Sequence, residues 1–444
     1  MKKIIYFFLN IYYNIMKYEF TDEQLKLKCI NISEEIIKDD DFLNDKNVTV
    51  FNSSILKIKN TNKLLIASRG WYGDVRTWEG YNFVVLSVFS DKLEKLEQNI
   101  LEVNFEAESI NTDLTKKKIK EIIPHDQKKD LKGPEDPRLF YFHGDIYILV
   151  NELNYSKKTS KIPRHMFLSK IDLDTLSYDE KKDVLCEKLS KNFEKNWGSF
   201  KYKNDLYMLY DINPLTIFKV KKNFDCRSIC EKKDKYIEEI DNSFPDLKFH
   251  LRNSTNLIKL KGTNKFLGLG HAVLDYKDNT EINKYIISLI DESEYSTRDK
   301  NYFKKFFKLY TAFFYVLDMD KKEITSLSPF FQLPNNESKQ ELIFFPTSIF
   351  LDKDNYVNIS YNVGDNRSYF LKIHLNIIKI SLYKKENINF LVNHNINLNF
   401  YLELVRNIRK VLGFSVNKLD YYGFKKQKSN TKHKKRHSKR TKRK

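Results

Sequence analysis

The residues with the clearest chemical potential lie in the run Gly133-Pro134-Glu135-Asp136-Pro137-Arg138. Pro137 pushes Asp136 toward an extended backbone, because a proline ring disfavours helical geometry at the residue before it. Arg138 places a fixed cation in the same turn, so a carboxylate is held beside a guanidinium. This arrangement suits acid–base chemistry, and a salt-bridged turn of no catalytic use would contain the same residues.

The elements around this run form a repeat. An alternating apolar run, a short turn rich in Asn, Asp, Gly or Lys, and a second alternating run occur five times, at residues 54–69, 138–152, 199–211, 255–271 and 347–361. Each copy has the composition of a β-hairpin. Further strand-like runs lie between the copies, at residues 82–90, 167–173, 217–221 and 312–319. A hairpin with one or two more strands is the content of a propeller blade.

We therefore predict an all-β fold, a five-bladed β-propeller with peripheral helices and a disordered basic C-terminal tail. A β-sandwich with coincidental hairpins is the alternative. Apolar spacing predicts helices near residues 22–38, 300–308 and 402–412. The expected organisation is an N-terminal extension (1–44) with a hydrophobic start and a helix, a propeller catalytic domain (45–395), a C-terminal helix and packing segment (396–424) and the tail (425–444).

The net charge of +19 is concentrated in that tail. Residues 425–444 contain twelve Lys or Arg and no acid, which leaves +7 on the rest of the chain. Like charges repel and nothing apolar is available for burial, so the tail is expected to be disordered. It is either a solubilising end or a contact for an anionic surface, a nucleic acid or a localisation receptor. A nucleic-acid-binding function would depend on this tail alone.

The N-terminus and the cysteines give weaker evidence about location and function. Lys2 and Lys3 precede an apolar segment at residues 4–16 that is too short to span a bilayer. The location is expected to be cytoplasmic, or membrane-associated through this weak hydrophobic segment. The four cysteines, Cys29, Cys186, Cys226 and Cys230, are too few and scattered for a disulfide framework, so we expect reduced thiols. No cluster has metal-ligand spacing, and no metal is predicted.

Polar residues end the second strand of each repeat. They are Arg69, Glu152 after Asn151, Asp211, His271 and Asp365. Equivalent positions in radially repeated blades converge near the central axis. A ring of such side chains is expected to form a polar pocket for a hydroxylated or anionic ligand.

The acidic run, followed by a strand, resembles the signature of glycoside hydrolase family 130, the β-mannoside phosphorylases and related hydrolases. It also resembles the related glycosyltransferase family 108. Other matches follow in order: Phe51-Asn52-Ser53 with Arg69, Lys195-Asn196-Trp197 with Asp211-Ile212-Asn213-Pro214, His250-Leu251-Arg252-Asn253-Ser254-Thr255 with Gly270-His271, and Tyr361-Asn362-Val363-Gly364-Asp365. The last departs from the family turn, since Gly364 and Asp365 are adjacent. The resemblance covers roughly residues 52–373 and implies a five-bladed propeller.

The resemblance also implies roles for residues. Asp136 would be the general acid, protonating the leaving oxygen through a sugar hydroxyl while phosphate attacks the anomeric carbon with inversion. Asn52, Ser53 and Arg69 would lie near the sugar and phosphate, Arg252 and His271 would contact phosphate or a phosphorylated donor, and Asp365 would bond sugar hydroxyls. Glu135, Arg138, Asn151 and Asp211 complete the expected substrate-binding set. Trp71, Trp78 and Trp197 would stack on sugars or pack in the core.

The predicted function is that of a carbohydrate-active enzyme, catalysing inverting glycosyl transfer or phosphorolysis on β-mannosides or similar glycans. No cofactor is expected; phosphate, a sugar phosphate or a nucleotide sugar would be the co-substrate, and a glycan or sugar phosphate the partner. Family phosphorylases place paired basic residues after the acidic motif, where this chain has Arg164 and His165 on a segment expected to be irregular. Hydrolysis on the same scaffold therefore stays open, as does a non-catalytic glycan-binding propeller.

Overall fold

The computed structural model describes the chain over the following residues: 29–74, 79–103, 109–111, 133–153, 164–184, 186, 196–242, 248–275, 283–284, 287, 291, 304, 308–328, 330–331, 333 and 343–385. The basic tail, residues 402–412, the apolar segment at 4–16, Trp78 and nearly all of residues 300–308 lie outside this part. In the described part, no helix is long and apolar enough to cross a membrane.

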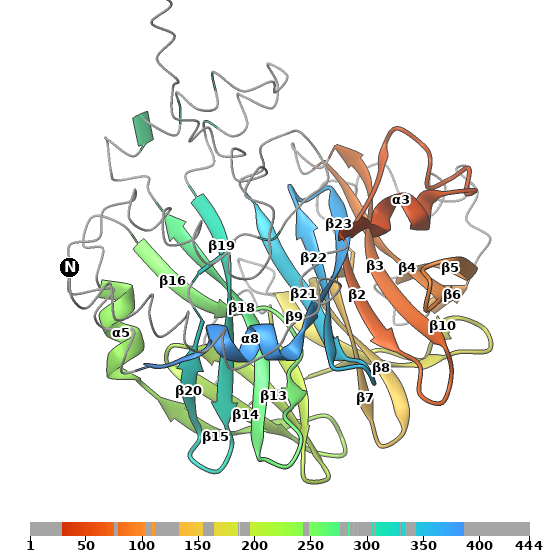
Figure 1. Ribbon diagram of the computed structural model, residues 1–444. Helices are drawn as coiled ribbons and strands as arrows, with labels where there is room; N and C mark the ends of the chain where they lie inside the picture. The colour runs from red at the N-terminus through yellow and green to blue at the C-terminus, as the bar shows by residue number, and fades with distance from the viewer. Residues whose placement is uncertain are drawn as a thin grey trace, which may run out of the picture.

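The strands form five antiparallel sheets, which we number as blades in chain order (Figure 1). Blade 1 contains β2 (Val48–Lys57), β3 (Lys63–Asp74), β4 (Glu79–Ser90), β5 (Lys95–Val103) and β6 (Ser109–Asn111). Blade 2 contains β7 (Glu135–Phe142), β8 (Asp145–Leu153), β9 (Arg164–Asp172), β10 (Ser177–Tyr178) and β11 (Lys182–Asp183). Blade 3 contains β12 (Gly198–Tyr202), β13 (Asp205–Ile212), β14 (Leu215–Val220) and β15 (Cys226–Lys232).

Blade 4 contains β16 (Lys248–Asn253), β17 (Ile258–Lys259), β18 (Lys265–Asp275), β19 (Lys308–Asp318), β20 (Glu323–Leu327) and β24 (Tyr383–Lys384). Blade 5 contains β21 (Phe344–Leu351), β22 (Tyr356–Val363), β23 (Arg367–His374) and β1 (Cys29–Asn31). Strands at the inner edges of the blades contact one another in a closed circuit, β2–β7–β12–β17–β21 and back to β2. The protein is thus a five-bladed propeller, as predicted.

Two distant parts of the chain build the fifth blade. β1 pairs with β23, with Ile30 opposite Phe370, so the outer strand comes from the N-terminal side. The blade therefore uses residues from the segment expected as an N-terminal extension. Helices α3 (Ile32–Ile37), beside β23 and β2, α5 (Lys235–Asn242), beside β16, and α8 (Leu375–Ser381), after β23, lie outside the sheets (Figure 1).

The apolar core is divided among the spaces between blades. One cluster joins blades 1 and 2 through residues such as Leu65, Val84 and Ile148. Another joins blades 2 and 3 around Trp197, and a third joins blades 5 and 1 beneath α3. Alternating side chains on each strand supply both faces of a blade, which explains why period-two patterning was the informative signal.

All five predicted hairpins are present, with one difference in the fourth. Its inner edge is divided into β16 and β17, both paired with β18, and β16 begins before the predicted run. The helix predicted near residues 22–38 is also wrong in part, because residues 29–31 form β1. Pairing with β23 buries Asn31 and overrides the helical spacing there.

The expectation of four reduced thiols is wrong for one pair. Cys186 and Cys226 form a disulfide between the end of blade 2 and strand β15 of blade 3, whereas Cys29 and Cys230 are not disulfide-bonded. The pair is 40 residues apart in the chain. Sequence spacing alone does not reveal that two neighbouring blades bring these positions together.

A buried hydroxyl network seals blade 5 against blade 1. The Ser53 amide donates to Ser368 Oγ at 2.9 Å, and the Ser368 amide donates to Ser33 Oγ at 2.8 Å. The Ser360 hydroxyl donates to the Ser53 carbonyl at 2.5 Å. These groups are shielded from water, so each hydrogen bond must be supplied by the protein.

Ser368→Ala is expected to lower the free energy of unfolding by about 1–3 kcal/mol, because the Ser53 amide would lose its acceptor inside the seam. Chemical denaturation measures this change. Ser90→Ala is the control, since the Ser90 hydroxyl accepts from backbone amides near solvent, and should leave the unfolding midpoint unchanged. Equal midpoints for wild type and Ser368→Ala would show that the seam does not depend on this hydroxyl.

Candidate active site

Asp136 lies at a β-bulge near the start of β7, the innermost strand of blade 2. The pairing of β7 with β8 shifts register between Glu135 and Arg138. Asp136 has φ +52°, so it is in the left-handed region and not extended, as Pro137 had suggested. A bulge redirects a side chain, and aspartate is among the residues that tolerate this conformation. Backbone strain of this kind is a feature that active sites often contain.

Blade 1 carries a matching feature. Asn52 has φ +51° and lies where β2 shifts register against β3, between Phe51 and Ser54. Its amide nitrogen donates to Asp136 Oδ1 at 2.6 Å. Two bulged inner strands therefore aim their side chains at each other across the boundary between blades 1 and 2.

The Arg69 guanidinium, on β3, completes this contact. Its Nε donates to Asn82 Oδ1 at 2.6 Å, its Nη1 donates to Asp136 Oδ1 at 3.2 Å, and its Nη2 forms an ion pair with Glu135 Oε1 at 3.1 Å. The guanidinium carbon lies 4.9 Å from the centre of the Phe51 ring. Arg69 is 4% exposed, so one buried cation is shared by two consecutive carboxylates.

Gly133 is required by the approach of this turn to blade 1. Its φ is +53°, and a Cβ there would lie 2.3 Å from the backbone oxygen of Asn82. No side chain fits at that distance. The glycine of the motif thus lets the Glu135–Asp136 segment lie against β4.

Arg138 links blade 2 to blade 5. Its Nη1 donates to the carbonyl of Thr347, and its guanidinium lies 5.3 Å from the centre of the Phe345 ring. Burial lowers the pKa of Arg138 to about 10, an effect that the charge of Asp136 opposes. Arg138 is 4% exposed, so it lies buried beneath the site and holds blade 2 against blade 5 there.

His271 approaches the same aromatic ring from blade 4. Its ring centre lies 4.9 Å from that of Phe345, and it stacks on Tyr310 at 5.8 Å. Ser254 Oγ lies 2.5 Å from His271 Nδ1. Phe345 therefore contacts both Arg138 and His271, and joins blades 2, 4 and 5.

Arg252 is exposed and lies opposite His271 in the β16–β18 pairing. Burial lowers the pKa of nearby His250, and the positive charge of Arg252 lowers it further. Asp211, at the end of β13 in blade 3, is among the carboxylates that oppose this shift. Blades 3 and 4 thus place one accessible guanidinium near two histidines and a carboxylate.

The remaining predicted residues are distributed as follows. Asp365, at φ +52° in the β22–β23 turn, accepts from the Asn362 amide at 3.1 Å. Asn151 is buried opposite Glu135. Trp71 and Trp197 are fully buried, so they pack in the core and cannot stack on a sugar.

The substrate-binding role predicted for Ser53 is wrong. Ser53 is completely buried, and its hydroxyl hydrogen-bonds to the Ser68 hydroxyl at 2.7 Å. Its backbone groups belong to the seam with blade 5. Ser53 therefore holds Asn52 in place and does not reach a ligand.

Two basic residues that follow the acidic motif, His165 and Lys181, form contacts within blade 2. Arg164 and His165 open strand β9 and are not on an irregular segment, and His165 Nδ1 lies 3.0 Å from Asp183 Oδ2. Lys181 forms a buried ion pair with Glu152. Burial lowers the pKa of Lys181, and the Glu152 charge opposes that shift. Asp183 and Glu152 are thus the partners of His165 and Lys181 in this blade.

Sequence reasoning missed Asn82 and Phe345. Asn82 is a buried amide in an otherwise apolar strand run, and that break in the pattern is the signal that could have found it. Phe345 gives no comparable signal, because an aromatic residue in a strand is ordinary. In the described part of the chain, no three His, Cys, Asp or Glu residues gather as metal ligands.

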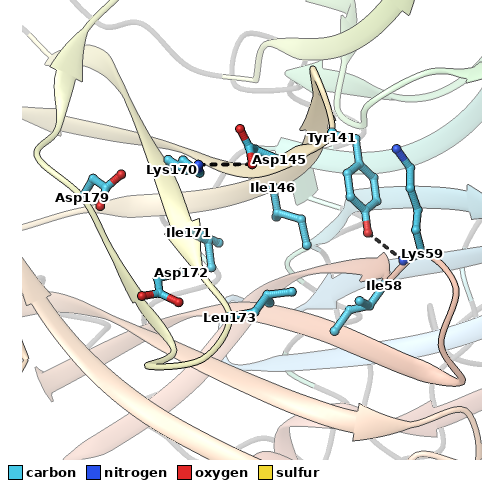
Figure 2. A pocket seen from close by; sticks show the side chains of 11 residues that line it. Ile58, Lys59, Tyr141, Asp145, Ile146, Lys170, Ile171, Asp172, Leu173 and Asp179 are labelled. Atoms are coloured by element: carbon cyan, nitrogen blue, oxygen red, sulfur yellow. Dashed lines mark hydrogen bonds and ion pairs between the residues drawn. The ribbon is translucent and has the colours of Figure 1, made fainter.

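A groove of about 450 Å³ lies elsewhere on blades 1 and 2 (Figure 2). Tyr141 on its wall is five residues along β7 from Asp136, about 17 Å at the rise of a strand. Its Lys170 pairs with Asp145 at 3.2 Å, and its Lys59 lies over the Tyr141 ring at 3.9 Å. The groove is therefore separate from the Asp136 site, at the opposite end of the strand.

No protein-family model matches the chain. No curated protein matches it either. Among solved structures, the chain is similar to a mannose phosphorylase from Leishmania mexicana in complex with phosphate ion (12% identity, 76% of this chain, 87% of that chain, TM-score 0.42). It is also similar to a GDP-Man-dependent mannosyltransferase from Leishmania mexicana (13%, 74%, 85%, TM-score 0.42) and to a β-1,2-mannobiose phosphorylase from Listeria innocua (10%, 76%, 93%, TM-score 0.45).

The likeness is one of fold. The five-bladed propeller that the motif resemblance implied is confirmed by the order of the strands in the five sheets. The chemistry available at the site follows from the contacts of Asp136 and its neighbours.

Proposed function

We propose that this protein is a carbohydrate-active enzyme that catalyses inverting glycosyl transfer or phosphorolysis on β-mannosides or similar glycans. The observation that carries the proposal is the Asp136 carboxylate, held at strained bulge geometry by Asn52 and Arg69 from the neighbouring blade. The motif resemblance supplies the substrate class. Asp136 is the acid–base residue of this reaction.

The hydrogen-bonding state of Asp136 suits the synthetic direction. A carboxylate that accepts from Asn52 and Arg69 is the base form. An acceptor hydroxyl would transfer its proton to Asp136, directly or through a sugar hydroxyl, while its oxygen attacks the anomeric carbon. The bond from that carbon to the phosphate oxygen breaks, and the phosphate leaves with the electron pair. In phosphorolysis the same proton returns to the glycosidic oxygen as phosphate attacks.

The anionic part of the donor needs a cation, and Arg252 is the best placed in blade 4. Its guanidinium is exposed, and a planar fork of donors binds phosphate oxygens in pairs. His250, two residues before it in β16, offers a ring nitrogen to the same group, whereas His271 is buried and packs against Tyr310 and Phe345. The donor phosphate would therefore lie over blade 4, with the reacting sugar between it and Asp136.

The test compares two donors and a condition without a donor, all with one acceptor. The purified protein is incubated with mannose 1-phosphate, with GDP-mannose or with neither, together with a manno-oligosaccharide, and products are measured by mass spectrometry. Elongation from mannose 1-phosphate with phosphate release indicates a phosphorylase, and elongation from GDP-mannose indicates a transferase. Shortening of the oligosaccharide without phosphate indicates a hydrolase. Binding of the oligosaccharide without any product would overturn the enzymatic proposal in favour of a glycan-binding propeller.

A further inference from the structure

We propose that Asn82 is a positioning residue, which fixes the Arg69 guanidinium in the orientation that Asp136 needs. The inference rests on the proposed role of Asp136, because Asn82 touches no reacting atom and acts only through Arg69. It assigns a function to a residue of β4 in blade 1 that lies outside the acidic motif.

The geometry of Arg69 carries the argument. Its three guanidinium nitrogens each have a different partner, with Nε bound to Asn82, Nη1 to Asp136 and Nη2 to Glu135. The contact to Asn82 is the shortest of the three, at 2.6 Å against 3.1 and 3.2 Å. A planar guanidinium with Nε anchored has one remaining arrangement in which each Nη group faces its own carboxylate.

Without the Asn82 oxygen, the orientation of Arg69 is no longer unique. Glu135 and Asp136 are adjacent, so a guanidinium free to turn could pair both of its end groups with Glu135 and leave Asp136. Asn82 is 1% exposed, so solvent does not readily replace its oxygen. The Asn82 amide nitrogen also lies 3.5 Å from Glu135 Oε1, which holds that carboxylate on the far side of the cation.

The backbone of Asn82 contributes to the same arrangement. Its carbonyl oxygen lies where a Gly133 side chain would be, so β4 and the acidic turn are in direct contact. One residue thus sets both the distance of the turn from blade 1, through its backbone, and the orientation of the cation, through its side chain. A side-chain substitution separates the two effects, because it leaves the carbonyl in place.

Three variants test the proposal. Asn82→Leu removes the acceptor at similar volume and is expected to lower kcat by about 10- to 100-fold, as a misplacement of about 1 Å in a catalytic group does. KM should change by less than about threefold, since a group that acts on the reacting centre affects kcat. Asn82→Asp keeps an oxygen for Arg69 Nε but replaces the amide that faces Glu135 with a carboxylate, so it should recover only part of the activity. Asn82→Ser, whose hydroxyl is too short, should behave as Asn82→Leu and serves if the leucine variant does not fold.

Asn358→Leu is the matched control. Asn358 is also 1% exposed, and its amide bonds to Asp352 at 3.2 Å and to the Tyr356 carbonyl at 3.0 Å in blade 5. Loss of this buried amide should reduce stability without changing kcat. The proposal is overturned if Asn82→Leu keeps wild-type kcat, or if Asn358→Leu lowers kcat as much as Asn82→Leu does.

A crystal structure of Asn82→Leu separates this inference from the proposed function. If the wild type turns over no donor, the proposed function is wrong. The crystal structure of Asn82→Leu then still tests whether Asn82 orients Arg69. Displacement of Arg69 Nη1 from Asp136 supports the orienting role of Asn82. An unchanged contact of 3.2 Å between Arg69 and Asp136 in the variant would overturn it.

Discussion

Asp136→Asn is expected to lower kcat by about 100- to 10,000-fold, the range that a positioned acid–base group contributes. Asparagine has the same shape as aspartate and can still contact Asn52 and Arg69, but it neither accepts nor returns the proton. The overall fold should persist, because Asp136 lies at the surface end of β7 with its side chain 12% exposed. Initial rates with whichever donor the wild type accepts measure the effect, and the circular dichroism spectrum checks the fold.

Asp172→Asn provides the control for this result. Asp172 is an exposed carboxylate in the groove of Figure 2, on the same blade but away from the bulge. Its substitution should leave kcat unchanged. Wild-type turnover by Asp136→Asn would exclude Asp136 as the acid–base residue, whatever other substitutions do.

Arg69→Leu is expected to reduce both stability and activity. The free energy of unfolding should fall by about 3–5 kcal/mol, because removal of the buried guanidinium leaves two half-buried carboxylates, Glu135 and Asp136, without their cation. Activity should fall at least as far as in Asp136→Asn, since the carboxylate loses its position. Urea denaturation and initial rates on the same preparation measure the two effects.

Two further substitutions serve as controls for the Arg69→Leu measurements. Lys170→Met breaks the ion pair with Asp145, in which both side chains are 45% exposed, and should leave the urea midpoint unchanged. Arg69→Lys retains a charge but has one nitrogen where arginine has three, so it should restore stability more than activity. A midpoint for Arg69→Leu equal to that of the wild type would show that the two carboxylates do not need a buried cation.

Much of the fold could be predicted from period-two alternation and turn composition. Hairpins such as residues 138–152 can be recognised from their local sequence, because each strand buries both faces between neighbouring blades. The closure of blade 5 could not be predicted in this way. β1 is short, its spacing resembles that of a helix, and only β23, more than 300 residues away, makes it a strand.

The site was predictable in its residues more than in its geometry. Asn52, Arg69, Glu135 and Asp136 were expected together, and the structure joins them directly. The left-handed backbone of Asp136 was not expected, because a proline after it favours extension and only the bulge overrides that preference. Ser53 was misassigned since a hydroxyl in a strand gives no sign of which side it faces. The role of Asn82 depends on the contact between β4 and the acidic turn. No local sequence pattern reveals that contact.

The most direct test of the account is a crystal structure of Asp136→Asn soaked with a manno-oligosaccharide. We predict that the sugar binds beside the bulges of blades 1 and 2, with a glycosidic oxygen or a sugar hydroxyl within hydrogen-bonding distance of residue 136, and with Arg252 on the side of the anomeric substituent. A sugar bound only in the groove of Figure 2, or on the outer strands of the blades, would contradict it.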